Sequence, residues 1–490
     1  MNIALSILSA LLMALVFPSA LSDHGWWPLA FVALTPLIVV AFREARALRR
    51  FLLGWLCGFV YWAVVCLWIQ FVLEVHGGMG PYLSWFAFVL FALYKGLHLA
   101  VFTWSAGWLA ARPRLWTALA IALLFTAIEQ THGFFGFAWL TPGNAAIDTP
   151  LLGRIAPLAG VFGITFLFAL VAAGIASAVA RRSWQFALPA VLGIGVLLIP
   201  AIPKPDPPDR NAVLLQPNIA EERSWSDADW RETSEQLIRL SREAAASHTD
   251  LIAWPEMPAP VYYFEDRQFA DQIGALARET GASVLLGTVG RAPSGAPLNS
   301  AAFVSPQGQL GGQYSKINLV PFGEFVPPLF SWVNKITKEA GDYAPGTKQT
   351  VFGAGGETLS TFICYESAFP DFVRVFVQDG AQLLVNISND GYFGRSAARE
   401  QHLSLVRMRA LENQRWILRP ANNGITVAID PSGRVTDRFP PYQQTAGRVA
   451  FRYVSTLTPY SRWGSWFAWL WAIAAILTLI PYLQRRRPAS

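Results

Sequence analysis

The chain divides into long apolar stretches and one long polar region. Eight stretches are apolar and almost uncharged over the roughly 17–25 residues that a helix needs to cross a bilayer. They lie near 2–21, 26–42, 51–73, 82–111, 115–131, 157–180, 184–200 and 466–483. Residues 1–20 lack a basic start and a clean cleavage site, so they predict a first membrane helix and not a cleaved signal peptide. The pattern predicts seven transmembrane helices in residues 1–200 and an eighth within residues 466–490.

The polar region, residues 201–465, has a different periodicity. Short apolar runs typical of buried strands occur at 212–215, 251–254, 283–288, 301–304, 359–364, 383–387 and 424–429. Helical patterns lie between several of them, at 227–246, 266–280, 369–378 and 399–414. Strands that alternate with helices indicate a layered α/β domain.

Composition and charge exclude two broad classes of protein. Hydrophobic residues make up 53% of the chain and charged residues 14%, whereas a disordered chain needs low hydrophobicity and high charge. The net charge of +6 divides into +5 in residues 1–200, −2 in residues 201–465 and +3 in residues 466–490. Because the excess lies outside the most polar region, it does not indicate a nucleic-acid-binding face.

The basic residues that flank the apolar stretches predict the orientation in the membrane. Positively charged loops stay on the cytoplasmic side, and the arginines cluster at alternate junctions: Arg43, Arg46, Arg49, Arg50, Arg112, Arg114, Arg181, Arg182, Arg485, Arg486 and Arg487. All of these junctions fall on one side if the chain starts inside. Both termini are therefore expected in the cytoplasm, and residues 201–465 on the outer side of the membrane.

The chain has three cysteines, and only one lies in the polar region. Cys57 and Cys66 fall within the third apolar stretch and are interpreted as packing residues. Cys364 follows a predicted strand in a compartment that is usually oxidising, where structural cysteines come in pairs. Its position alone leaves two alternatives open, a nucleophile or a buried bystander.

A thiol nucleophile needs a base and a group that stabilises an oxyanion. His248 and His402, the histidines of the polar region, stand in no recognisable catalytic setting. Glu256 follows a predicted strand, between tryptophan, proline and methionine residues that would partly desolvate it and make it a better base. A loop carboxylate is an equal alternative for Glu256, and a solvated side chain is the ordinary interpretation of Lys316.

These residues resemble a known family in their order. Glu256, Lys316 and Cys364 are similar to the Glu–Lys–Cys triad of the nitrilase superfamily. More narrowly, the segment 316–327, KINLVPFGEFVP, and the segment 364–366, CYE, resemble the apolipoprotein N-acyltransferases. The resemblance implies eight membrane spans with an extracytoplasmic nitrilase-like domain, an α-β-β-α sandwich, between the last two. It covers the whole chain and agrees with the topology predicted from charge.

The resemblance also implies roles for individual residues. Glu256 corresponds to the general base, Lys316 to the group that stabilises the oxyanion and Cys364 to the nucleophile. Residues that match supporting positions of the active site are Glu324, Tyr365 and Glu366. Positions that match substrate-binding or loop residues are Trp225, Asn389 and Tyr392, where Tyr392 replaces an expected tryptophan in the segment NISNDGYFG at 386–394.

The family's reaction implies the partners. A phospholipid is the expected acyl donor and a diacylated apolipoprotein the acceptor, with no metal, nucleotide or other cofactor. The protein is expected to act as a monomer in the bacterial inner membrane, with its catalytic domain in the periplasm. Apolar residues that would line a lipid entry are Tyr262, Tyr263, Phe264, Pro327, Leu329, Phe330 and Trp332.

Two other functions remain open. A membrane-tethered amidase or nitrilase would use the same triad with water as the acceptor, although one span would suffice to tether it. A transporter with a large outer domain would need ionisable groups inside the membrane. The candidates for such groups are Glu74, Lys95, His98 and Glu129, of which only Lys95 and His98 lie well inside a predicted span.

Overall fold

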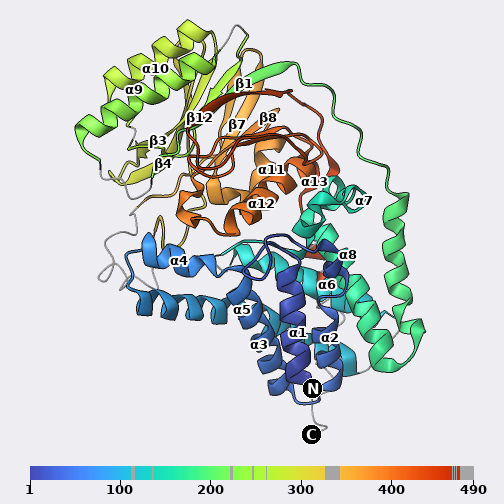
Figure 1. Cartoon of the computed structure of the whole chain (residues 1–490). Coiled ribbons are helices and arrows are strands. Elements are labelled where there is room, and N and C mark those ends of the chain that lie inside the picture. The colour runs from blue at the N-terminus through green and yellow to red at the C-terminus, as the bar shows by residue number, and fades with distance from the viewer. Residues whose placement is uncertain are drawn as a thin grey trace.

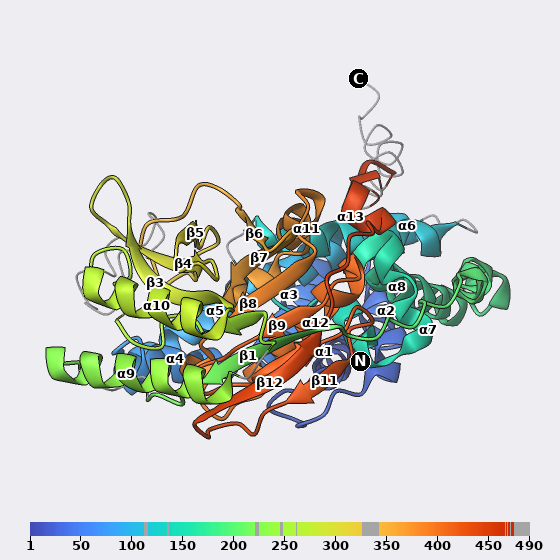
Figure 2. The ribbon, with the colours of Figure 1, turned by 90° about the horizontal axis from the view of Figure 1, so that it is seen from above.

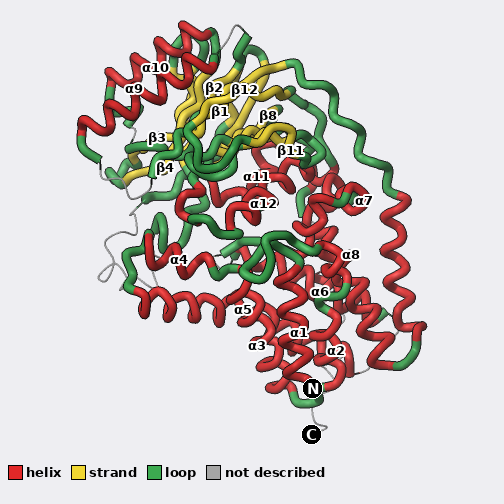
Figure 3. The backbone as a smooth tube through the Cα atoms, in the orientation of Figure 1, coloured by secondary structure: helices red, strands yellow, loops and turns green. Residues whose placement is uncertain are grey.

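The computed structural model places an α/β domain on top of a helical bundle (Figure 1). It describes residues 1–111, 116–134, 137–220, 225–245, 248–260, 262–325, 343–465, 467, 469–470 and 472–474. The strands lie in the upper half of the molecule only, whereas the lower half is built from helices (Figure 3). Residues 199–209 connect the two parts along one side of the molecule (Figure 1).

The bundle contains helices of very different length. Its elements are α1 (Asn2–Leu15), η1 (Trp27–Phe31), α2 (Thr35–Arg43), α3 (Ala47–Val65), α4 (Trp68–Val75), α5 (Pro81–Ala111), α6 (Thr117–Gln130), η2 (Thr131–Gly133), η3 (Pro142–Asp148), α7 (Pro150–Gly153), α8 (Ala156–Arg181) and η4 (Trp184–Leu198). Among the described residues, Ala47–Val65, Pro81–Ala110 and Ala156–Arg181 are long and apolar enough to cross a membrane. The count of eight spans stays a prediction.

Several predicted spans have a different local structure. The stretch 51–73 is not one helix, because it is interrupted after Val65 and continues as α4. The stretch 26–42 begins as a short 3-10 helix before α2, and the stretch 184–200 is a 3-10 helix, η4. Most of the eighth stretch, 466–483, lies outside the described residues; those described in it, up to residue 474, are helical.

Small residues bring the two central helices of the bundle together. A Cβ atom added to Gly58 of α3 would lie 2.5 Å from Cα of Gly96 in α5. Only glycine permits this approach of two backbones, a form of packing that is common between membrane helices.

The α/β domain is an α-β-β-α sandwich, as the family resemblance predicted. One six-stranded sheet has the order β12-β1-β2-β3-β4-β5 and the other β11-β10-β9-β8-β7-β6. Apolar side chains from both sheets form a shared core, including Leu214, Leu285, Phe362 and Val385. Helices α9 (Asp227–Ala244) and α10 (Arg267–Thr280) lie on the side of the domain away from α8 (Figures 1 and 2).

The predicted strands are confirmed, but five further strands were missed. The observed strands are β1 (Arg210–Gln216), β2 (Leu251–Ala253), β3 (Ser283–Arg291), β4 (Pro297–Val304), β5 (Leu310–Ser315), β6 (Val351–Ala354), β7 (Glu357–Ile363), β8 (Leu383–Ile387), β9 (Ile417–Arg419), β10 (Val427–Ile429), β11 (Val435–Arg438) and β12 (Thr445–Phe451). Strands β5, β6, β9, β11 and β12 were not predicted. Several of these are partly exposed edge strands without a continuous apolar run.

Helices α11 (Pro370–Gln378) and α12 (Ala398–Asn413) lie between the second sheet and the bundle (Figure 1). One side of α12 packs into the core of the sheets through Leu403 and Val406. Its other side packs with apolar residues of the bundle through Leu405 and Met408. The short α13 (Pro459–Trp463) returns the chain to α8. Domain and bundle therefore share a continuous apolar contact.

Candidate active site

Lys316 is the centre of a buried cluster of charges. It follows β5 directly and is 1% exposed. Its Nζ atom donates to Oε1 of Glu256 at 3.2 Å and to Oε1 of Glu324 at 2.9 Å. Burial alone would lower the pKa of Lys316, but the two carboxylates outweigh it and hold that pKa well above its ordinary value. Lys316 is therefore a fixed ammonium group, suited to stabilising negative charge.

Glu256 lies in the loop after β2 and is buried. Its Oε2 atom accepts a hydrogen bond from the backbone N–H of Asn389 at 2.9 Å. The loop rests against Gly287 of β3, where an added Cβ would lie 2.4 Å from the carbonyl oxygen of Pro255. The expected burial of this carboxylate is confirmed, but Trp254 does not contribute to it, because its indole donates to Ser241 of α9.

Asn299 of β4 joins the two carboxylates. Its Nδ2 atom lies 2.7 Å from Oε1 of Glu256 and 2.7 Å from Oε1 of Glu324. The second oxygen of Glu324 accepts from the backbone N–H of Val320 at 2.8 Å. Each Oε1 atom therefore has two donors, Lys316 and Asn299, which fix both carboxylates in place. Sequence reasoning missed Asn299.

Glu366 connects the segment around Lys316 with the end of β7. Its Oε1 atom accepts from the hydroxyl of Tyr314 at 2.7 Å and from the backbone N–H groups of Ile317 and Asn318 at 2.8 and 3.1 Å. Its Oε2 atom accepts from the backbone N–H of Ile363 at 2.7 Å. Burial raises the pKa of Glu366 to about 7, although these hydrogen bonds act in the opposite direction and lower it. The side chain fixes the backbone on both sides of the site.

Cys364 begins the 3-10 helix η6 (Cys364–Ala368) at the end of β7, and it is 8% exposed. Its φ angle of 48° lies in the left-handed region, which is uncommon for a residue other than glycine. Burial and the charge of Glu256 raise the pKa of the Cys364 thiol, while the charge of Lys316 lowers it. Both groups are thus near enough to act on the sulfur electrostatically.

Tyr365 points from the domain into the bundle. Its ring stacks on Phe137 at 6.0 Å between centroids and on Trp139 at 6.4 Å, and meets Phe369 edge-on at 5.2 Å. The residue next to Cys364 is therefore part of the contact with the bundle.

The remaining predicted positions lie outside this cluster, apart from Asn389. Trp225 is half-buried and packs in the apolar core beside α9 and α10. Tyr392 is 46% exposed, and its ring contacts His76 of the bundle at 5.0 Å. Of the expected lipid-entry residues, Tyr263 is buried and Tyr262 more exposed; Pro327, Leu329, Phe330 and Trp332 lie outside the described residues.

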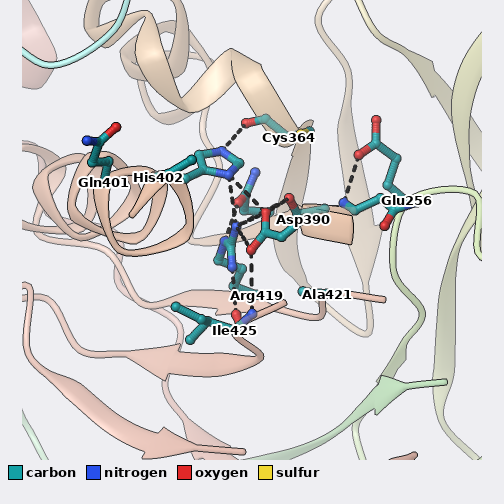
Figure 4. A network of polar contacts seen from close by, with 12 residues as sticks. Glu256, Cys364, Asp390, Gln401, His402, Arg419, Ala421 and Ile425 are labelled. Carbon is teal, nitrogen blue, oxygen red and sulfur yellow. Dashed lines mark hydrogen bonds and ion pairs between the residues drawn. The ribbon is translucent and has the colours of Figure 1, made fainter. Parts of the chain in front are cut away.

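His402 is the second residue of the site that sequence reasoning missed, together with two charged neighbours. His402, Asp390 and Arg419 are all 0% exposed and lie next to Cys364 (Figure 4). The available signal was the position of Asp390 within the segment 386–394, beside Asn389. The other histidine of the domain, His248, is exposed.

Polar side chains in the bundle lie beneath Tyr365. Lys95 is 0% exposed and donates to the carbonyl oxygen of Phe137 at 2.8 Å. It also contacts Nδ1 of His132, whose Nε2 lies 3.3 Å from Oε1 of Glu129. These contacts join Lys95 to the segment whose Phe137 ring stacks on Tyr365. In the described part of the chain, no group of three or more His, Cys, Asp or Glu residues is placed to hold a metal ion.

Comparisons with known proteins identify the family. Residues 9–174 match the apolipoprotein N-acyltransferase N-terminal domain, and residues 212–447 match the carbon-nitrogen hydrolase family. The apolipoprotein N-acyltransferase of Geobacter metallireducens is 33% identical, over 99% of this chain and 95% of that protein. That of Pseudomonas syringae pv. tomato is 32% identical, over 91% of this chain and 91% of that protein. That of Vibrio cholerae is 30% identical, over 95% of this chain and 94% of that protein. A solved structure of the Nesterenkonia AN1 amidase, from the nitrilase superfamily, aligns with 53% of this chain and 95% of its own, at 18% identity and a TM-score of 0.39. Similarity to relatives of this identity over nearly the whole chain places the protein in the apolipoprotein N-acyltransferase family.

Proposed function

We propose that this protein transfers a fatty acyl chain from a membrane phospholipid to the N-terminal α-amine of a diacylglyceryl-cysteine on apolipoproteins. The observation that carries the proposal is the buried group of Glu256, Lys316 and Glu324 beside Cys364. The names of the relatives support the class of reaction.

The first half of the reaction forms a thioester. Glu256 takes the proton from the thiol of Cys364 as the sulfur attacks the carbonyl carbon of a phospholipid ester. The bond from that carbon to the glycerol oxygen then breaks, and Glu256 returns the proton to the departing lysophospholipid. Lys316 stabilises the negative charge that develops on the carbonyl oxygen, because it stays an ammonium group.

The second half transfers the acyl chain to nitrogen. The unprotonated α-amine, which is about a tenth of the total at pH 7 because its pKa is about 8, attacks the thioester carbon. The carbon–sulfur bond of Cys364 breaks, Glu256 takes the proton lost by the new amide nitrogen, and that proton restores the thiol. The base acts twice and is unchanged after each cycle.

Both substrates are lipids held in a bilayer, and the contacts of the domain with the bundle support this choice. Tyr365, adjacent to Cys364, stacks on Phe137 and Trp139 of the bundle. A substrate anchored in the membrane therefore has a short path to the thiol. The amidase alternative would not require the site to lie at this contact. We place the domain in the periplasm and both termini in the cytoplasm of a protein of the inner membrane, acting as a monomer.

The experiment compares wild-type and Cys364→Ser membranes incubated with phospholipid labelled in its acyl chain. The wild-type protein should carry label that neutral hydroxylamine removes, as expected of a thioester. Cys364→Ser should carry no such label. Hydroxylamine-sensitive label on the serine variant would refute the assignment of the nucleophile.

The acceptor is tested separately. Mass spectrometry of a lipoprotein N-terminus from cells with and without the protein should differ by one acyl group on the amine. Release of ammonia from small amides, with unchanged lipoprotein termini, would instead support the amidase alternative.

A further inference from the structure

A second group of buried charges, made of Asp390, His402 and Arg419, lies next to Cys364 (Figure 4). The guanidinium of Arg419 donates from one nitrogen, Nη2, to Oδ1 and Oδ2 of Asp390 at 2.8 and 2.9 Å. Burial would raise the pKa of Asp390, but Arg419 and His402 outweigh it and hold that pKa below its ordinary value. Asp390 is therefore an anion that the protein has fixed in its interior.

His402 connects this ion pair to the nucleophile. Its Nδ1 atom lies 3.0 Å from Oδ1 of Asp390, and its Nε2 atom lies 3.1 Å from the carbonyl oxygen of Cys364. A carbonyl oxygen only accepts hydrogen bonds, so Nε2 carries a proton and donates to Cys364. The imidazole ring is confined by Trp139 and Phe393, with centroids at 5.8 and 5.7 Å.

Ser388 forms a second connection between the same ion pair and Cys364. Its hydroxyl donates to Oδ1 of Asp390 at 3.0 Å and lies near the thiol of Cys364, whose pKa it lowers against the larger effect of burial. Nη2 of Arg419 lies 3.3 Å from the same hydroxyl oxygen. The backbone of Cys364 is thus joined to the buried pair of Asp390 and Arg419 through His402, and Ser388, which is bonded to the same pair, lies near its sulfur.

These contacts matter because Cys364 has a backbone conformation that it would not adopt freely. A φ of 48° is unfavourable for a residue with a Cβ atom, and such a residue keeps this conformation only where its surroundings impose it. The hydrogen bond from His402 holds the carbonyl of Cys364, which belongs to the peptide group that follows the Cα atom of this residue. A rotation of that group would move the sulfur relative to Glu256 and Lys316.

We propose that His402, held by Asp390 and Arg419, is a positioning residue that keeps Cys364 in its left-handed conformation and so aims the thiol at Glu256 and Lys316. This inference rests on the proposed role of Cys364 as the nucleophile. His402 itself contacts no substrate in this proposal. This role differs from the catalytic base for which His402 was considered in the sequence, because His402 donates a hydrogen bond to the carbonyl of Cys364 and takes up no proton.

The test uses two substitutions at one position and a control on the same helix. His402→Leu removes the donor to the Cys364 carbonyl, whereas His402→Gln keeps an N–H group at a similar reach. The control is Asn413→Ala, which removes buried hydrogen bonds to Arg409 and Ser461 at the other end of α12. At 1.5 Å per residue this position is about 16 Å along the helix from His402.

The main measurement is the alkylation rate of Cys364 by iodoacetamide, followed by mass spectrometry of its peptide in the full-length protein. A misplacement of about 1 Å can cost about 100-fold in rate, so we expect that order of loss in kcat for His402→Leu, with KM unchanged. Alkylation should also slow. His402→Gln should recover most of both rates. Asn413→Ala should lower the melting temperature and leave alkylation unchanged.

Two results would overturn the proposal. One is wild-type alkylation and kcat in a folded His402→Leu variant. The other is an equal loss of alkylation rate and kcat in His402→Leu and His402→Gln, in proportion to the drop in melting temperature of each variant. A residue with a purely structural role would give that result. Because iodoacetamide requires no acyl donor, an altered alkylation rate supports the positioning role even if phospholipid is not the substrate. Failure of the proposed function would appear instead as a missing thioester in the wild-type protein.

Discussion

Replacing Lys316 with methionine should destabilise the protein because it leaves two buried carboxylates without their cation. Glu256 and Glu324 each place an oxygen within 3.2 Å of the Lys316 ammonium group. The same two oxygens both lie 2.7 Å from Asn299 Nδ2, so the carboxylates stay close together after the substitution. Methionine fills a similar volume, so loss of charge dominates.

The size of the effect follows from the burial of the pair. Removing one partner of a buried ion pair costs about 3–5 kcal/mol because it leaves a charge without compensation. For a domain of this size, such a loss lowers the melting temperature by about 6–20 °C. The side chains of Glu256 and Glu324 are 7% and 13% exposed, so solvent screens their charges only weakly.

The pH dependence of the variant has a definite sign. Without the ammonium group, one carboxylate of the pair takes up a proton when the protein is folded, because two adjacent buried anions repel each other. The folded state then binds more protons than the unfolded state, and stability rises as the pH falls. Acidification from pH 8 to pH 5 should therefore raise the melting temperature of Lys316→Met relative to that of the wild type.

Thermal unfolding of detergent-solubilised protein, followed by the fluorescence of its 20 tryptophans, measures these shifts. Lys348→Met is the matched control, since Lys348 is exposed and should give no change. A double variant, Lys316→Met with Glu324→Gln, should recover much of the stability but none of the acyl transfer. A shift below about 2 °C for Lys316→Met, without dependence on pH, would refute the view that Lys316 neutralises both carboxylates.

Three further predictions concern neighbouring residues. Glu366→Gln places an amide N–H against backbone donors and should lower the free energy of unfolding by about 1–3 kcal/mol. Thioester formation should also be slower in a single-turnover assay, and an unchanged melting temperature and rate would contradict the role of Glu366. Gln401→Leu should lower the melting temperature, since Gln401 bonds two tryptophans and two backbone carbonyls of the bundle; an unchanged melting temperature would show that these hydrogen bonds do not stabilise the fold. Alkylation of Cys364 should keep rising with pH through pH 9, because burial and Glu256 hold the thiol pKa above its ordinary value; a plateau near pH 7 would contradict this.

The sequence was most informative where a strand is buried on both faces. Strand β8 was predicted at 383–387 and is found there, since a short run that is apolar at every position except Asn386 is typical of a buried strand. Strand β11 was missed because its burial alternates between half-buried and exposed positions. Similarly, the apolar stretch 51–73 gave no sign of its interruption after Val65, because both halves are equally hydrophobic.

The residues of the candidate site also divide into those that the sequence predicted and those that it did not. Glu256, Lys316 and Cys364 follow strands, and their order along the chain was enough to place them together through the family resemblance. Asn299 lies within β4 and reaches Glu256 only through the pairing of sheet strands, which no local pattern shows. His402 reaches Cys364 only because α12 packs across the end of β7. Contacts of this kind depend on tertiary packing and were not predictable from spacing.

The position of α12 explains why the domain and the bundle form one unit. The bundle helices are interrupted at two places, after Val65 and at Gly160, whose φ of 64° breaks the helical path. Each interruption leaves a backbone group without a helical partner, which is costly where no water is available. Gln401 donates to the carbonyl oxygen of Val65 at 3.0 Å, and Glu412 accepts from the N–H of Val161 at 2.8 Å. Both side chains belong to α12, and His402, the neighbour of Gln401, reaches Cys364 from the same helix. The contacts that complete the bundle are therefore made by the helix that holds the nucleophile in place. A simple tether would need neither interruption, so this coupling is consistent with the proposal that the substrate arrives through the membrane part of the protein.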